Sequence, residues 1–321
     1  MLKSLLKWSG LILAAVFVLF SIIPYLVPPG ELPGNRYQMA FANSKFASEG
    51  GAELHYRHWE GNGRANVLLV HGLGGSTFSW RYTAPALEDE GYRVIAVDLP
   101  GFGLSERAGG LDHSSTARAE RLWFFLEDSY PGEDWHLVGH SMGGATVTDM
   151  ALQKPQNVVS LVLVAGALAE FEPTLFDSLL QYPPVSRWVR LLAPEFFLSE
   201  NRIENALENS YGRKPTAEEF AGYYKPLTVE GTDAVLADLV KTAPTPLLHR
   251  VEELELPVLC IWGEDDAVVP LERGERLNRM IPGSELAVME GEGHCPMETL
   301  PDEFNSLMLN FLNRVESPSG N

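Results

Sequence analysis

The sequence predicts an α/β protein with a mostly parallel central sheet, helices on both faces of that sheet, and an inserted helical cap. Three observations support this prediction. Short segments that are apolar throughout alternate with amphipathic segments along most of the chain, as buried parallel strands alternate with helices. A glycine-flanked serine lies between one predicted strand and the next predicted helix. The alternation stops between residues 169 and 240 and then resumes.

The first 30 residues differ in composition from the rest of the chain. Lys3 and Lys7 precede an apolar run, Leu11–Val27, which is apolar on all faces, unlike the amphipathic helices of a soluble core. We therefore expect a single-pass anchor over residues 1–30, with its amino terminus in the cytoplasm and the folded domain periplasmic or on the outer face. A cleaved signal peptide is the alternative, although the nearest small-x-small match lies well downstream.

Proline and glycine cluster just after this run, so a semi-rigid linker is expected over residues 31–44. The first part of the folded core is expected over residues 45–168, where apolar runs predict strands and 3.6-residue periodicity predicts helices. In order, these elements are strand Glu53–Trp59, strand Val67–Val70, helix Tyr82–Glu90, strand Tyr92–Asp98, helix Ser114–Glu127, strand Trp135–Val138, helix Gly144–Leu152 and strand Leu161–Ala165.

Residues 169–240 are expected to form the helical cap. They contain no convincing strand, several prolines and many aromatic residues. Trp188, Phe196 and Phe197 are candidates for the substrate wall, and packing inside the cap is the alternative for each. The core is expected to resume over residues 241–316 and to end in a tail at 317–321. Its elements are strand Val258–Trp262, helix Leu271–Met280, strand Glu285–Met289 and helix Pro301–Val315.

Composition excludes several classes of function. The net charge of −19 and the absence of a basic stripe argue against binding to nucleic acid. The two cysteines, Cys260 and Cys295, do not form a disulfide framework, and no cluster of Cys and His indicates a metal site. We therefore expect no metal and no organic cofactor.

The stretch Gly139-His140-Ser141-Met142-Gly143 fits the pattern Gly-x-Ser-x-Gly. A serine on a sharp strand-to-helix turn exposes its Oγ, and the flanking glycines allow the strained backbone and the close packing of helix on strand. A nucleophilic serine needs a base, and the base needs a carboxylate that orients it. Asp266 and His294 each follow a predicted strand, so they are expected on the same edge of the sheet as Ser141.

Four blocks in this order resemble the α/β-hydrolase-fold serine hydrolases, and the likeness runs from about Lys45 to Arg314. The blocks are His71–Gly75, Asp98–Ser105, Gly139–Gly144, and the two loops that carry Asp266 and His294. The resemblance implies Ser141 as nucleophile, Asp266 as acid and His294 as base. It also implies an oxyanion hole formed by the backbone N–H groups of Leu73 and Met142.

Other residues compete for these roles. Asp265 is the rival to Asp266, and the family spacing Gly-x-x-Asp from Gly263 favours Asp266. Some members of the family carry the acid after the sixth strand, which would point to Glu170 or Glu172. His140 adjoins the nucleophile, but the turn is expected to direct its side chain away from the Ser141 hydroxyl.

Departures from related families narrow the reaction. Haloalkane dehalogenases and epoxide hydrolases use an aspartate nucleophile, which Ser141 excludes. The motifs of proline iminopeptidases and the extended oxyanion motif of carbon–carbon bond hydrolases are missing. We therefore expect an esterase or lipase-like hydrolase that acts on a small ester or lipid-like substrate. The alternatives are a thioester, amide or carbon–carbon bond hydrolase of the same fold, or a non-catalytic, membrane-tethered binding protein.

Overall fold

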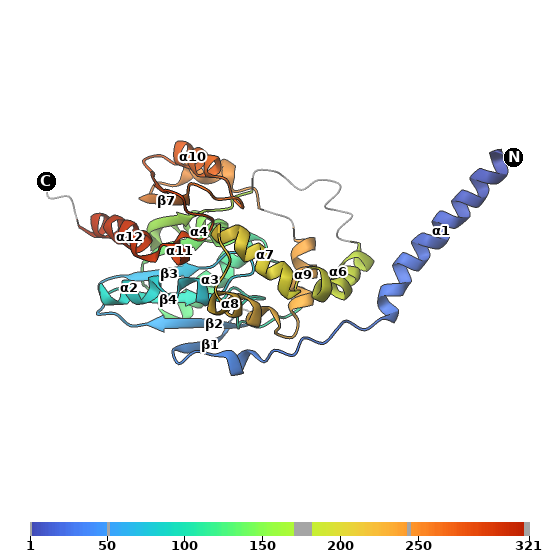
Figure 1. The fold of residues 1–321 in the computed structure, drawn as a ribbon. Coiled ribbons are helices and arrows are strands. Elements are labelled where there is room, and N and C mark those ends of the chain that lie inside the picture. The colour runs from blue at the N-terminus through green and yellow to red at the C-terminus, as the bar shows by residue number, and fades with distance from the viewer. Residues whose placement is uncertain (1, 50–51, 170–181, 243–244, 318–321) are drawn as a thin grey trace.

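The computed structural model describes residues 2–49, 52–169, 182–242 and 245–317 (Figure 1). Its centre is an eight-stranded sheet in the order β1-β2-β4-β3-β5-β6-β7-β8. β2 is antiparallel to β1 and to β4, and all other neighbouring strands are parallel. The strands are β1 Ser44–Glu49, β2 Ala52–Trp59, β3 Asn66–Val70, β4 Arg93–Val97, β5 Trp135–His140, β6 Val158–Val164, β7 Val258–Gly263 and β8 Glu285–Met289.

The mostly parallel sheet expected from the sequence is confirmed, and the structure adds one strand to it. β3 and β5 are buried along their whole length, as their apolar sequences predict. The added strand, β1, has the polar sequence Ser-Lys-Phe-Ala-Ser-Glu, which gave no strand signal. It forms because it is an edge strand: its backbone hydrogen-bonds to β2 on one side and has no neighbouring strand on the other.

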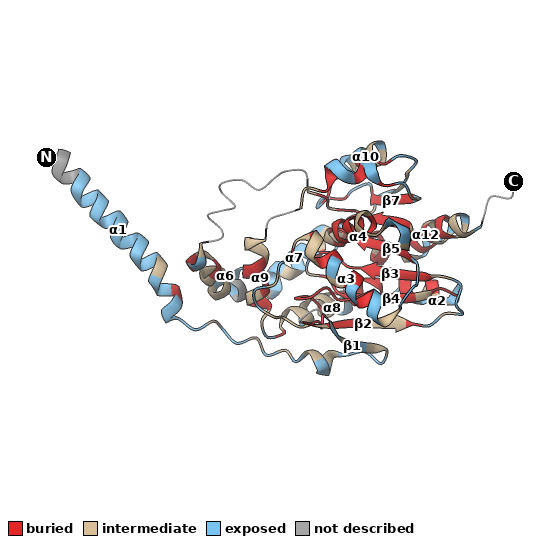
Figure 2. Ribbon diagram, turned by 180° about the vertical axis from the view of Figure 1, so that it is seen from behind, coloured by how far each residue is buried: buried red, intermediate tan, exposed pale blue. Residues whose placement is uncertain are grey.

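Helices cover both faces of the sheet (Figures 1 and 2). The cluster on one face packs strand side chains against α3, α4 and α10, and the cluster on the other face packs them against α2, α11 and α12. These helices are α2 Thr83–Asp89, α3 Ser115–Ser129, α4 Met142–Gln153, α10 Leu271–Met280, α11 Pro296–Thr299 and α12 Pro301–Glu316. Short 3₁₀ turns are η1 Arg36–Met39, η2 Thr77–Trp80, η3 Pro155–Asn157 and η4 Leu248–Glu253.

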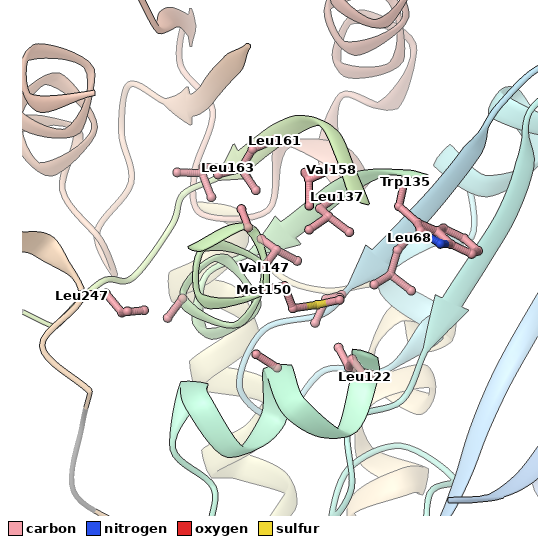
Figure 3. Packing of buried hydrophobic residues seen from close by; sticks show 14 of the residues in the cluster. Leu68, Leu122, Trp135, Leu137, Val147, Met150, Val158, Leu161, Leu163 and Leu247 are labelled. Carbon is pink, nitrogen blue, oxygen red and sulfur yellow. The ribbon is translucent and has the colours of Figure 1, made fainter. Parts of the chain in front are cut away.

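The core below α4 fixes the position of the predicted nucleophile. Val147 and Met150 of α4 are fully buried against Leu137 of β5 and Leu163 of β6 (Figure 3). Leu122 of α3 belongs to the same cluster and faces Met150 (Figure 3). Apolar burial of this kind contributes roughly 1.5–3 kcal/mol for each large side chain. The strand and the helix on either side of Ser141 are therefore held rigidly.

Between β6 and β7 in the sequence, in the region expected to form the cap, the described residues form four α-helices (Figure 1). The described residues of this region contain no strand of the sheet. α7, α8 and α9 lie over the edge of the sheet that carries the predicted site, and α6 packs on α9. The four helices are α6 Pro183–Phe196, α7 Glu200–Tyr211, α8 Ala217–Leu227 and α9 Thr232–Lys241.

The N-terminal helix α1 (Leu2–Leu26) extends away from the domain that contains the sheet (Figures 1 and 2). Its 21-residue segment Leu6–Leu26 has a mean hydropathy of 2.3 and is almost wholly exposed, so it is long and apolar enough to cross a membrane. Its carboxyl-terminal half contacts α6. Trp188 Nε1 donates to the carbonyl of Phe20 at 2.9 Å, and Arg187 Nε donates to the carbonyl of Pro24 at 2.9 Å.

Candidate active site

Ser141 occupies the turn between β5 and α4. Its φ of 50° and ψ of −117° are rare for a residue with a side chain, and such strain is characteristic of functional turns. The turn is held by backbone hydrogen bonds: Ser141 N donates to Val164 O at 2.9 Å, and Ser141 O accepts from Gly144 N at 2.9 Å. The predicted nucleophile therefore sits on a strained turn that the neighbouring strand supports.

Two glycines in the motif are required by close packing. A Cβ atom on Gly139 would lie 2.5 Å from the carbonyl oxygen of Gly143, and a Cβ atom on Gly143 would collide with the carbonyl of Val70. Any side chain at these positions would push α4 away from the sheet. The glycines of the motif thus allow α4 to start directly behind Ser141.

His294 and Asp266 are brought together by the loops that follow β8 and β7. His294 Nδ1 lies 2.8 Å from Asp266 Oδ2, and both residues are buried. Asp266 Oδ1 accepts the backbone N–H groups of Val268 and Val269, each at 2.8 Å. The carboxylate is therefore fixed on one side by its own loop and presents the other oxygen to the imidazole, which leaves Nε2 of His294 available as a base.

The rival acids differ from Asp266 in position. Asp265 is exposed, and its backbone N–H donates a hydrogen bond to the carbonyl of Glu292 at 2.9 Å. Glu170 and Glu172 lie outside the described residues. Among the acids that the structure describes, Asp266 is the one in contact with the His294 ring.

His140 and His71 brace the loops around the site. His140 Nε2 donates to the carbonyl of His294 at 2.9 Å. On the other side of this ring, a Cβ atom on Gly72 would lie only 2.8 Å from His140 Nδ1. His71 Nε2 accepts the N–H of Leu99 at 3.0 Å, so its proton lies on Nδ1 and is donated to Gly72 O at 2.7 Å. Burial lowers the pKa of both imidazoles, which keeps them neutral.

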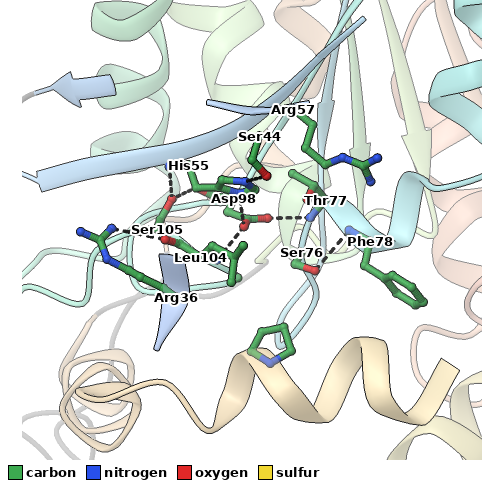
Figure 4. Close-up of polar contacts among 12 residues, drawn as sticks. Arg36, Ser44, His55, Arg57, Ser76, Thr77, Phe78, Asp98, Leu104 and Ser105 are labelled. Carbon is green, nitrogen blue, oxygen red and sulfur yellow. Dashed lines mark hydrogen bonds and ion pairs between the residues drawn. The ribbon is translucent and has the colours of Figure 1, made fainter. Parts of the chain in front are cut away.

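Asp98, at the end of β4, ties together three segments near the site (Figure 4). Its carboxylate accepts the N–H of Thr77 and the N–H of Leu104, each at 2.6 Å, and contacts His55 Nδ1 at 2.6 Å. Burial acts to raise the pKa of Asp98, but the contacts with His55 and with backbone N–H groups hold it below its usual value. Asp98 therefore braces loops near the candidate site.

Ser141, His294, Leu73 and Met142 all line one cavity of about 640 Å³ under the cap. Met142 is the first residue of α4, so its backbone N–H is one of the free donors of a helix start. The cap supplies much of the remaining described lining, and most of these cap residues are apolar. These apolar residues are Phe197, Leu198, Ile203, Ala206, Leu207, Pro226, Leu227, Val235, Leu236, Leu239 and Val240.

Two of the three aromatic residues expected at the substrate wall lie elsewhere. Phe197 lines the cavity, but Trp188 and Phe196 are not among its described lining residues. Trp188 instead stacks on Phe20 of α1, with ring centroids 5.9 Å apart, and Phe196 is exposed at the end of α6. The expectation differs from the structure because α6 faces α1 and α9, whereas the described cap residues that line the cavity begin with Phe197, just after α6.

A model of the alpha/beta hydrolase fold family matches residues 65–301, which is well over half of the chain. The chain belongs to the α/β-hydrolase fold family. This agrees with the eight-stranded sheet, the strained serine turn and the order of the three candidate residues along the chain. The fold expected from the resemblance is therefore confirmed.

Relatives of this α/β-hydrolase are named as hydrolases. It is 32% identical over 291 residues to a 2-hydroxy-6-oxononadienedioate/2-hydroxy-6-oxononatrienedioate hydrolase of Paraburkholderia phymatum, over 84% of this chain and 96% of that enzyme. It is 30% identical over 267 residues to a Bacillus subtilis protein named uncharacterized hydrolase YugF, over 82% of this chain and 95% of that protein. The chain is thus a hydrolase, and the first name agrees with the carbon–carbon bond alternative better than with ester hydrolysis.

One similar solved structure includes the N-terminal region. It is a membrane phospholipase A described as a bacterial virulence factor, with a TM-score of 0.71, 23% identity, and coverage of 98% of this chain and 99% of that chain. The likeness extends into α1, because the 25 residues of this helix exceed the 2% of the chain left uncovered. At this identity the likeness concerns the fold alone.

Sequence reasoning missed a polar group beside the candidate oxyanion loop. Ser79 and Tyr223 line the cavity, and their hydroxyl oxygens lie 2.9 Å apart. Behind them lies Glu298, a buried carboxylate in contact with Tyr223 and Arg81. No local pattern identifies these residues, because they come from η2, α8 and α11 and meet only in the folded chain.

Proposed function

We propose that this protein is a carboxylic ester hydrolase with Ser141 as nucleophile, His294 as base and Asp266 as the orienting acid. The observation that carries the proposal is that Ser141, on its strained turn, and His294, hydrogen-bonded to Asp266, line the same cavity. Most of the surface of this cavity is apolar. A cavity of about 640 Å³ is in the range of small-molecule sites and is large enough for a substantial acyl chain.

The proposed mechanism follows from these positions. His294 takes the proton of Ser141 as Oγ attacks the ester carbonyl, and Asp266 stabilises the imidazolium that forms. The N–H groups of Leu73 and Met142 hold the oxyanion. His294 then protonates the departing alcohol, and water releases the acid from the acyl-enzyme by the same sequence of proton transfers.

The cap supports an apolar substrate. Helices α7 and α9 contribute Leu207, Val235 and Leu236 to the wall, together with Phe197 and Leu198 from the segment between α6 and α7. Burial of hydrocarbon against such a wall contributes about 0.8 kcal/mol for each methylene. A longer acyl chain should therefore bind more tightly until the cavity is filled.

The names of the relatives favour a second candidate, cleavage of a carbon–carbon bond in a hydroxy-oxo-dienedioate. Such a substrate carries two carboxylates, which need charged or N–H partners when buried. Arg107 is the one Lys or Arg among the described residues that line the cavity. Its guanidinium already donates to three backbone carbonyls and to Thr232 Oγ1. This arrangement favours a substrate without carboxylates.

The proposal also places the enzyme at a membrane. α1 is long and apolar enough to span a bilayer, and its carboxyl-terminal half contacts cap helix α6. The exposed aromatic residue Phe196 ends α6 and the exposed Phe197 follows it, so both can enter the lipid interface. An amphiphilic ester could then reach the cavity from the bilayer.

The test uses the full-length chain in detergent micelles. Wild type and Ser141→Ala are compared on p-nitrophenyl esters of increasing acyl length, on a 2-hydroxy-6-oxo-dienedioate, and with a fluorophosphonate probe. We expect ester hydrolysis that falls at least about 10³-fold in Ser141→Ala, and labelling of the wild type alone. Faster turnover of the dienedioate than of any ester would establish the second candidate. If the wild type shows no turnover of any substrate and no labelling by the probe, a non-catalytic binding protein is favoured.

A further inference from the structure

The cavity has one polar side, and it lies beside the candidate oxyanion loop. A Cβ atom built on Gly75 would lie 3.2 Å from Ser79 Oγ, so the Ser79 hydroxyl packs against this loop. Tyr223 reaches the same place from α8, and its hydroxyl lies 2.9 Å from Ser79 Oγ. Both residues line the cavity that contains Ser141 and His294.

Glu298 lies behind this pair of hydroxyls. Its carboxylate accepts a hydrogen bond from Tyr223 Oη and another, at 3.0 Å, from Tyr211 Oη, and it forms an ion pair with Arg81. Burial raises the pKa of Glu298, and the contacts with Arg81 and the two tyrosine hydroxyls act against that rise. The buried charge is therefore compensated by a cation, as a buried carboxylate requires.

The direction of each hydrogen bond follows from counting protons. Tyr223 has one hydroxyl proton, and that proton is donated to Glu298. Ser79 must therefore be the donor in its contact with Tyr223. Burial raises the pKa of Tyr223 well above its usual value, so the phenol keeps its proton. Both hydroxyl protons are committed inside the protein, and the pair offers only oxygen lone pairs to the cavity.

These hydrogen bonds limit which chemical groups the Ser79–Tyr223 pair can bind. Without a free proton it cannot stabilise an oxyanion, which needs donors. Because Arg81 compensates the charge of Glu298, the site has no net charge that would attract an ammonium group. A neutral hydrogen-bond donor satisfies both conditions, and the neutral donor that the alcohol part of an ester can carry is a further hydroxyl group.

We infer that Ser79 and Tyr223 form a subsite that accepts a free hydroxyl on the alcohol part of the substrate. The inference rests on the proposed ester hydrolysis. The acyl chain would occupy the apolar wall of α7 and α9, and the polyol-like alcohol would lie against the Ser79–Tyr223 pair next to the oxyanion loop. The substrate class is then a monoacyl ester of a polyol, not an ester of a simple alcohol.

The experiment compares two esters of one acid, 1-monodecanoylglycerol and propyl decanoate, which differ by the hydroxyl groups on a three-carbon alcohol. In wild type we expect a kcat/KM preference for the glycerol ester of about tenfold, carried by KM, as a single hydrogen bond allows. Tyr223→Phe and Ser79→Ala should each reduce this preference severalfold, because kcat/KM should fall more for the glycerol ester than for propyl decanoate.

Tyr211→Phe is the matched control. It removes the same kind of phenol–carboxylate hydrogen bond from Glu298, but Tyr211 is not among the described lining residues of the cavity. Tyr211→Phe should therefore keep the preference for the glycerol ester.

An unchanged preference in both Tyr223→Phe and Ser79→Ala, or an equal loss of preference in Tyr211→Phe, overturns the inference. Equal turnover of the two esters by wild type also overturns it. Failure to cleave either ester would instead overturn the proposed ester hydrolysis. If Tyr223→Phe fails to fold, Ser79→Ala decides the question.

Discussion

The backbone N–H of His294 donates to the carbonyl of Ser210 at 2.7 Å. Ser210 belongs to cap helix α7, and a Cβ atom on the neighbouring Gly293 would lie 2.5 Å from the same carbonyl. The cap therefore both covers the cavity and holds the loop that carries the candidate base. Removal of the whole cap would disturb His294, so single substitutions are the better way to examine the cavity.

Leu236→Trp should shorten the acyl chain that the enzyme accepts. Leu236 is partly exposed to the cavity from α9, and an indole there would fill space needed by a long chain. We expect kcat/KM for a palmitate ester to fall at least about tenfold and that for a butyrate ester to change less than about threefold. Leu192→Trp, on the exposed side of α6, should leave the acyl profile unchanged. If kcat/KM depended on acyl length in the same way in Leu236→Trp and in Leu192→Trp, the proposed acyl wall would be contradicted.

The choice of acid can be tested with two neighbouring carboxylates. Asp266→Asn should lower kcat about 10⁴-fold, because the amide no longer fixes the tautomer of His294 or stabilises its cation. Asp265→Asn should change kcat less than about twofold, since Asp265 is exposed. The measurement is ester hydrolysis under saturating substrate. A reversed order of severity would move the acid to Asp265.

The stability of the cap should depend on pH through Glu219. This residue caps α8 and pairs with Arg213, whose hydrogen bonds lower the pKa of Glu219 from its usual value to about 2. A lowered pKa means that the stabilisation is complete above the unfolded pKa of about 4.5 and is lost as the pH falls towards about 2. We expect Glu219→Gln to lower Tm by about 2 °C at pH 7.

The difference in Tm between wild type and Glu219→Gln should shrink steadily as the pH is lowered from about 4.5 to about 2. Glu218→Gln, on the exposed side of the same helix, is the control and should not change Tm at any pH. A difference that stays constant down to pH 2 would show that the capping geometry, and not the charge, accounts for the effect.

The N-terminal helix should act as an anchor with the hydrolase domain outside. Alkaline carbonate should not release the full-length chain from membranes, because Leu6–Leu26 would be embedded in lipid. Protease added to intact spheroplasts should digest the domain, as Lys3 and Lys7 retain the amino terminus in the cytoplasm. A soluble product that lacks α1 would identify a signal peptide, and protection from external protease would reverse the orientation.

Local sequence patterns are enough to predict the strands of the sheet other than β1 and the order of the three candidate residues. Strands such as β3 and β5 are buried on both faces, so they must be apolar throughout, and this pattern is visible without a structure. Ser141, Asp266 and His294 each follow a strand, and parallel strands bring their carboxyl ends to one edge. Their meeting could therefore be predicted from local patterns alone.

The contacts between segments that are distant in the chain depend on how the elements pack, and local patterns do not predict them. β1 is polar and forms because β2 supplies its hydrogen-bond partners. Trp188 packs on Phe20 instead of entering the cavity, because α6 turns one side to α1. Tyr223 and Glu298 meet across 75 residues of sequence. A local pattern records which face of an element is buried, whereas the partner on that face is set by how the elements pack.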